Sequence, residues 1–186
     1  TCKSKVIDFT LQLNLKKSKM ENNKSIYKND IGMAAKAGAI LFVLWGILHL
    51  WVGFEGIHQY LSGGASGLWN MLIGGSNAPR AGFQHTTDAM TANAQAHLIL
   101  NFCIDVAGYG LLGLVVAWLI WTRGSWVAYF LGVFIIGVAD LGFLFSLVTP
   151  GIIELNAGSV SGPAIWFIAC AITPFGLPKL RKHSKE

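Results

Sequence analysis

The sequence predicts an all-α integral membrane protein, built as an antiparallel four-helix transmembrane bundle. Of its 186 residues, 53% are hydrophobic and only 12% are charged, whereas about 25% of the residues in a soluble domain are charged. Four apolar stretches approach the length of about 20 residues that crosses a bilayer. They are continuous and lack the alternation of barrel strands. This composition argues against a soluble domain, a nucleic-acid binder and a disordered chain.

The predicted transmembrane domain covers residues 37–178 and contains four spans. The first three are the clearest, and they cover about residues 37–60, 94–121 and 126–148. The fourth, at about 163–178, is the weakest, because this length of helix measures only about 24 Å. It reaches across a bilayer more easily if it starts earlier. Since the spans are even in number, both termini are expected on the same side of the membrane.

Basic residues set the expected orientation. The Lys-rich tail 1–36 and the basic tail 179–186 hold most of the Lys and Arg residues, and Arg80 is the only one expected on the opposite side. The positive-inside rule therefore predicts that both tails are cytoplasmic, in a bacterial inner (plasma) membrane. We expect the first tail to be disordered. Residue 1 is not Met and Met20 is a candidate start, so an alternative interpretation excludes residues 1–19 from the native protein.

The connections between the spans are unequal in length. Residues 122–125 form a very short loop, which predicts a tight hairpin. The first loop, about 61–93, is long enough to act as a lid or a docking surface, and the alternative is an ordinary surface connection. Its apolar segment 68–73 is expected to lie in the membrane interface. Thr86 or Thr87 is expected to cap the second helix, with Asp88 in its first turn.

Polar side chains inside the spans are the most informative feature of the sequence. Ionisable residues are costly in a membrane and often functional. His97, Asn101 and Asp105 recur every four residues and therefore form one stripe on the second span. We expect Asp140 to meet this stripe across the hairpin. The expected pocket-lining residues are Glu55, His58, His97, Asn101, Asp105 and Asp140.

The expected pocket faces outward, because these polar groups lie in the outer half of the spans. No Lys or Arg lies within any span, so each carboxylate must be protonated, hydrated, paired with a His cation or bound to an external cation. Four further residues are secondary candidates. His49 points away from the other polar residues of the first span, and the other three are the loop residues His85, Asp88 and Glu154.

Several functions fit such a pocket, and the sequence leaves them open. The first is binding of a proton, a cation or a small polar molecule. The second is a membrane oxidoreductase that uses a metal held by His58, His97 and Glu55, or a haem. The third is an accessory subunit in an oligomer or larger membrane complex, whose polar residues only tie helices together. In each case the lipid bilayer is an expected partner, and nucleic acid is not.

Overall fold

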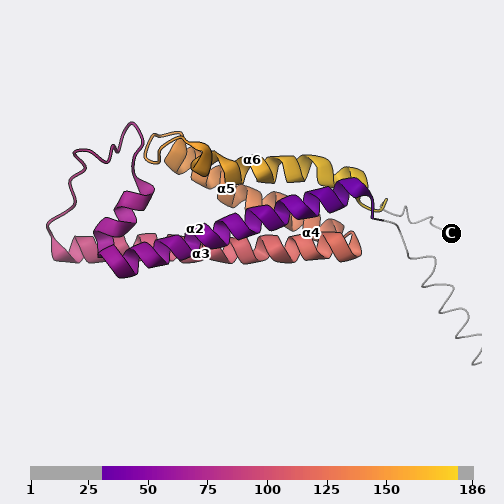
Figure 1. Ribbon diagram of the computed structural model, residues 1–186, viewed down its shortest axis with the longest axis horizontal. Helices are drawn as coiled ribbons and strands as arrows, with labels where there is room; N and C mark the ends of the chain where they lie inside the picture. The colour runs from indigo at the N-terminus through magenta and orange to yellow at the C-terminus, as the bar shows by residue number, and fades with distance from the viewer. Residues whose placement is uncertain (1–30, 180–186) are drawn as a thin grey trace, which may run out of the picture. The chain divides into compact units, whose positions relative to one another are not determined.

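The computed structural model describes residues 31–179. Most of both predicted tails, residues 1–30 and 180–186, lies outside the described residues, whereas residues 33–36, expected in the first tail, form the start of the first helix. All regular structure between Ile31 and Lys179 is helical, with no strand. Four helical stretches in this part of the chain are long and apolar enough to cross a membrane. Their labels follow Figure 1 and begin with α2.

The four stretches follow one another along the chain, and the connections between them differ in length. The first two are α2 (Met33–Leu72) and α3 (Ala89–Arg123). The third runs without a break over Trp126–Val148, in agreement with the predicted span. It consists of α4 (Trp126–Leu131), the π-helical η1 (Gly132–Ile136), α5 (Gly137–Phe143) and the π-helical η2 (Leu144–Val148). The fourth consists of α6 (Ala157–Ile172) and the 3₁₀ turn η3 (Thr173–Gly176).

Helix α2 extends well beyond the predicted first span. At about 1.5 Å per residue, the part of α2 before its kink, residues 33–63, measures about 46 Å, which is about one and a half times the thickness of a bilayer core. It bends at Gly64, where φ is +56°, a value that glycine adopts without a Cβ clash. The segment 68–73, expected in the membrane interface, forms the last turn of this helix and the residue after it, and both Leu68 and Ile73 are buried within the protein.

Polar caps fix where α3 and α6 begin. The cap of α3 is Asp88, whose carboxylate accepts a hydrogen bond from the Thr91 amide at 2.7 Å, so the prediction that Thr86 or Thr87 caps this helix was wrong. Asn156 and Ser159 cap α6 reciprocally, in the arrangement known as a capping box. The fourth stretch therefore starts six residues earlier than expected, and Pro163 lies inside it.

Helices α2 and α3 make the most extensive contact in the described chain, and they lie along one another in Figure 1. Glycines allow the close approach. A Cβ on Gly46 would lie 2.8 Å from the carbonyl oxygen of Gly110, and one on Gly53 would lie 2.6 Å from that of Cys103. Later residues of α2 thus meet earlier residues of α3, so the two helices run in opposite directions.

The other helices pack on α2 through aromatic residues. Phe42 and Trp45 of α2 are fully buried, and they share a core with Val116 of α3 and Trp166 of α6. The Trp166 indole donates a hydrogen bond to the Gly132 carbonyl at 2.9 Å, which ties α6 to the third stretch. The helices turn many large apolar side chains outward instead, among them Ile47, Phe54, Leu111, Phe134, Val138 and Phe167.

Candidate functional site

A buried carboxylate lies at the centre of the helices. Asp140 of α5 is only 3% exposed. One of its oxygens, Oδ2, accepts a hydrogen bond from the Trp45 indole at 2.8 Å. The other, Oδ1, lies 3.4 Å from Nε2 of His49. Both partners come from α2, so the prediction that Asp140 meets the polar stripe of α3 was wrong. Counting residues from the end of each predicted span places Asp140 at about the same depth in the membrane as Asn101. Depth alone does not show which neighbouring helix a side chain faces.

Each nitrogen of the His49 ring faces an oxygen atom. Nδ1 of the ring is 2.9 Å from the Trp45 carbonyl oxygen, and a carbonyl oxygen can only accept a hydrogen bond. Nε2 lies within ion-pair distance of Oδ1 of Asp140, at 3.4 Å. His49 is therefore held between a backbone acceptor and a buried carboxylate.

Packing holds the His49 ring in this position. The ring stacks on the Trp45 indole, with centroids 3.6 Å apart and planes inclined by 24°. On its other side, a Cβ on Gly162 of α6 would lie 2.9 Å from Cε1 of His49, so only glycine lets α6 come this close. Asp140 belongs to a short α-helical segment between two π-helical ones, and π-bulges are frequent at functional sites.

The His49–Asp140 pair lines a pocket of about 510 Å³. Residues of all four helical stretches and of two connecting loops contribute to its wall. Much of the lining is apolar or aromatic and includes Trp51, Phe102, Tyr109 and Phe143. A volume in this range is typical of sites for small organic molecules.

Two further carboxylates line the same pocket without a basic partner. Glu55 accepts a hydrogen bond from the side-chain amide of Gln59, and Asp105 accepts one from that of Asn101 at 3.0 Å. In the described part of the chain, neither carboxylate forms an ion pair with Lys, Arg or His. Both were expected at the pocket.

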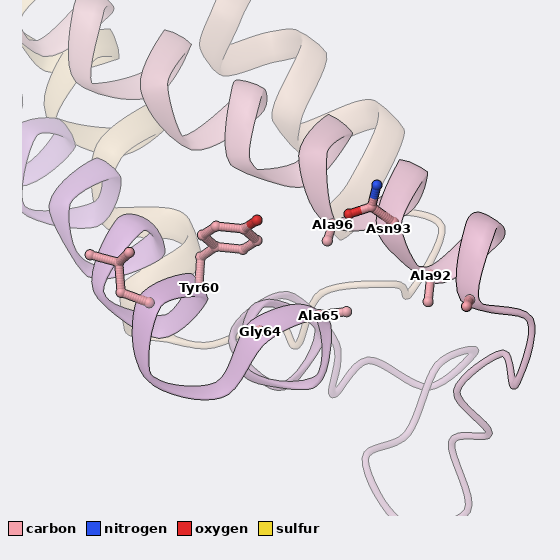
Figure 2. A pocket seen from close by; sticks show the side chains of 8 residues that line it. Tyr60, Gly64, Ala65, Ala92, Asn93 and Ala96 are labelled. Carbon is pink, nitrogen blue, oxygen red and sulfur yellow. The ribbon is translucent and has the colours of Figure 1, made fainter.

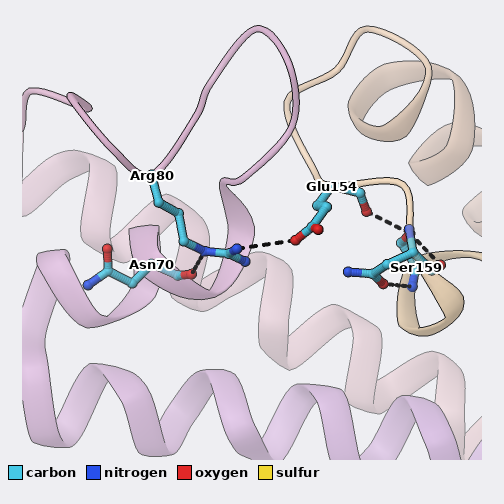
Figure 3. Close-up of polar contacts among 5 residues, drawn as sticks. Asn70, Arg80, Glu154 and Ser159 are labelled. Carbon is cyan, nitrogen blue, oxygen red and sulfur yellow. Dashed lines mark hydrogen bonds and ion pairs between the residues drawn. The ribbon is translucent and has the colours of Figure 1, made fainter.

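An ion pair between the loops lies at the wall of the pocket (Figure 3). Arg80 of the first loop donates a hydrogen bond to Glu154 of the third loop at 3.2 Å, and another to the Asn70 carbonyl at 3.3 Å. Both charged side chains are about half exposed. Backbone bonds join the same loops, from Gly75 to the Ile152 carbonyl at 3.0 Å and from Asn77 to that of Gly151 at 2.8 Å. These contacts fix the first loop against the third.

Three expected pocket residues lie elsewhere. His58, His97 and Asn101 are exposed and do not line this pocket. Asn101 touches the site only through its bond to Asp105. The His97 ring lies 5.8 Å from the ring of Tyr60, which belongs to a separate, open pocket of about 630 Å³ between α2 and the start of α3 (Figure 2). All three residues of the α3 stripe are exposed, and Asp105 is the one that also lines the pocket beside His49 and Asp140.

The residues considered for a metal are not gathered in the structure. Glu55, His58 and His97 form no ligand set, and residues 31–179 contain no group of three or more His, Cys, Asp or Glu side chains placed to hold a metal ion.

The two secondary candidates in the first loop are at the surface. His85 packs edge-on against Phe83, with ring centroids 5.1 Å apart. Asp88 caps α3 as described above. The hydrogen bonds that it accepts from Thr91 lower the pKa of its carboxyl below the ordinary value of 3.8.

Two residues that contact the candidate site residues were not predicted from the sequence. Trp45 was read as an apolar residue of the first span, although an indole N–H inside an apolar helix requires an acceptor and Asp140 was available. Arg80 was counted only for topology, although it is the one basic residue expected on its side of the membrane and therefore the natural partner for Glu154.

Searches of protein-family models, of curated proteins and of solved structures gave no match for this chain.

Proposed function

We propose that this chain is an integral membrane protein, folded as an antiparallel four-helix bundle, whose outward-facing polar pocket binds a proton and a small cation or polar molecule. The proton is held by His49 and Asp140, and the second ligand lies beside Glu55 and Asp105. The large apolar side chains on the outside of the helices support membrane insertion, because lipid is their natural solvent. The positive-inside rule favours a bacterial inner membrane with both termini in the cytoplasm.

One observation carries the proposal. A carboxylate that is 3% exposed contacts an imidazole at 3.4 Å on the wall of a pocket. A charged carboxylate without compensation is costly in such a place, and His49 is the basic side chain that lies within ion-pair distance of it. A cation that enters the pocket would compensate the carboxylate in place of a proton. The pocket thereby couples cation binding to proton release.

Proton release on cation binding tests the proposal. Purified protein in lipid nanodiscs is mixed with Na⁺, methylammonium or tetraphenylphosphonium in weak buffer with a pH dye. The wild-type protein is expected to release protons with at least one of these cations, whereas Asp140→Asn releases none. Glu55, Asp105, Tyr109, Arg80 and Glu154 also face the pocket, so Glu55→Gln/Asp105→Asn is measured in parallel. No release from the wild type, or equal release from Asp140→Asn, would overturn the proposal.

The exposed stripe of α3 favours a second candidate function, that of an accessory subunit. His97 and Asn101 lie on the outer surface of a helix that also exposes Leu98 and Ile104. Polar side chains on such a surface can bind a neighbouring membrane helix. Loss of a larger native complex in His97→Ala/Asn101→Ala, with unchanged proton release, would support this function.

A further inference from the structure

The charges of the pocket identify the chemical class of its ligand, if the pocket has the proposed function. Two acidic residues of the pocket have a basic partner, since Asp140 lies beside His49 and Glu154 beside Arg80. Two carboxylates remain, Glu55 and Asp105, and each is contacted only by a neutral amide. The pocket is therefore lined by four acidic and two basic side chains, and this excess of acidic groups favours a cationic guest.

The size and lining of the pocket restrict the guest further. A volume of about 510 Å³ is many times the space of roughly 30 Å³ that one water occupies in the liquid. A bare metal ion or hydronium would leave most of the pocket to water beside apolar walls. Trp51, Phe102, Tyr109 and Phe143 line it, and such aromatic walls favour both apolar bodies and cations.

We infer that the ligand is an organic cation with an apolar body. Its positive group is attracted by Glu55 and Asp105, and its body packs against the aromatic wall. An anion of the same shape would face two carboxylates, and a neutral molecule would leave them without a counter-charge. Inorganic cations can neutralise the carboxylates, but they have no apolar body to pack against the aromatic wall.

A matched pair of probes tests this inference. Tetraphenylphosphonium and tetraphenylborate have nearly the same size and shape but opposite charge. Their saturable binding to the protein in nanodiscs is measured by equilibrium dialysis, with empty nanodiscs subtracted. We expect saturable binding of the phosphonium and none of the borate. Excess Na⁺ or Mg²⁺ should displace the phosphonium weakly.

Variants locate the binding. Glu55→Gln and Asp105→Asn should each weaken phosphonium binding about tenfold, the change produced by losing an interaction of about 1.4 kcal/mol. Asp88→Asn is the matched control, because it removes a carboxylate outside the pocket and keeps an oxygen that can cap α3. Its binding should equal that of the wild type.

Any one of three results would overturn the inference. They are saturable binding of the borate, no saturable binding of the phosphonium, or equal phosphonium binding by the wild type and the pocket variants. The wild-type probe comparison is sufficient even where a variant fails to fold. Proton release with Na⁺ alone would keep the proposed function and reject the organic cation, so the two failures are distinguishable.

Discussion

At the scale of single residues, Asp140 accepts a hydrogen bond from the Trp45 indole and contacts His49. Two substitutions separate the structural role of these contacts from the role of the carboxyl group. Asparagine retains an oxygen for the Trp45 indole and an amide that can donate to Nε2 of His49. Leucine leaves both partners buried without a hydrogen bond. Leaving a buried polar group unsatisfied costs about 1–3 kcal/mol. We therefore expect Asp140→Leu to lower the free energy of unfolding by about 2–4 kcal/mol, and Asp140→Asn to stay close to the wild type.

Unfolding in detergent, followed by circular dichroism, measures this difference. Equal stability of the two variants would mean that the contacts of Asp140 with Trp45 and His49 contribute little to the fold. The comparison also serves the proposed function, because a stable Asp140→Asn that no longer releases protons has lost chemistry and kept its structure.

Some residues of the site could be predicted from the sequence, and others could not. Glu55, Asp105 and Asp140 were identified because a carboxylate inside an apolar helix without a nearby cation requires an explanation. Their partners could not be identified in the same way. Helical spacing gives the direction of a side chain around its own axis, but the contact of His49 with Asp140 depends on how α2 is rotated against α5. That rotation is set by packing at glycines such as Gly162.

At the scale of elements, the start of α3 depends on pH through Asp88. Its pKa is lowered by the hydrogen bonds from Thr91, so the ionised carboxylate is the form that the folded cap prefers. The stabilisation is therefore present above the unfolded pKa of about 3.9 and is lost as the pH falls through the lower, folded value. We expect faster amide hydrogen exchange in the first turn of α3 under those acidic conditions. In Asp88→Asn, which caps without a titrating group, the exchange should show no such transition, and an identical transition in both proteins would contradict this account.

The ion pair between the loops should limit access to the pocket. Arg80 and Glu154 line the pocket and join the loops around it. A half-exposed ion pair contributes only about 0.2–1 kcal/mol, so breaking it should speed entry by about 1.4- to fivefold. The measurement is the rate of thiol labelling of Ile153→Cys, another lining residue, in a background in which the three native cysteines are replaced.

The reversed pair is the control for this experiment. Arg80→Glu alone should label faster, and Arg80→Glu/Glu154→Arg should return towards the rate of the parent. High salt should speed labelling of the parent, because salt screens exposed charges. If the reversed pair labels as fast as the single variant, the loops are held together by their backbone bonds alone.

Helix ends were harder to predict than helix cores. The bounds of the third stretch agree with the approximate span expected at 126–148, because polar or turn-forming residues follow its apolar run at once. The first two helices extend beyond their apolar cores, since a helix continues outside the bilayer wherever its residues pack or its caps allow. Leu68 shows this, because it is apolar, lies far from the predicted span and is buried against Ala96 and Cys103.

At the scale of the whole described chain, basic groups gather at one end of the helices. The Lys36 ammonium lies 5.8 Å from the ring of Trp121, and the Arg123 guanidinium lies 5.6 Å from that of Trp118. A Cβ on Gly124 would lie 2.6 Å from Pro178, so the turn after α3 meets the segment after η3. Arg80, by contrast, lies in the first loop and is paired with Glu154 of the third loop. Tryptophans near cations are typical of the membrane interface.

This distribution makes the orientation testable. With both termini in the cytoplasm, a cysteine at Ser76 in the first loop should react with a membrane-impermeant maleimide in intact cells expressing the protein. A cysteine at Ser184 in the basic tail should react only after the membrane is opened. Both are placed in the background without native cysteines. Because Arg80 is the one basic residue expected outside, adding lysines to the first loop should reduce labelling at position 76. Labelling of Ser184→Cys in intact cells, with Ser76→Cys protected, would reverse the topology and turn the pocket towards the cytoplasm.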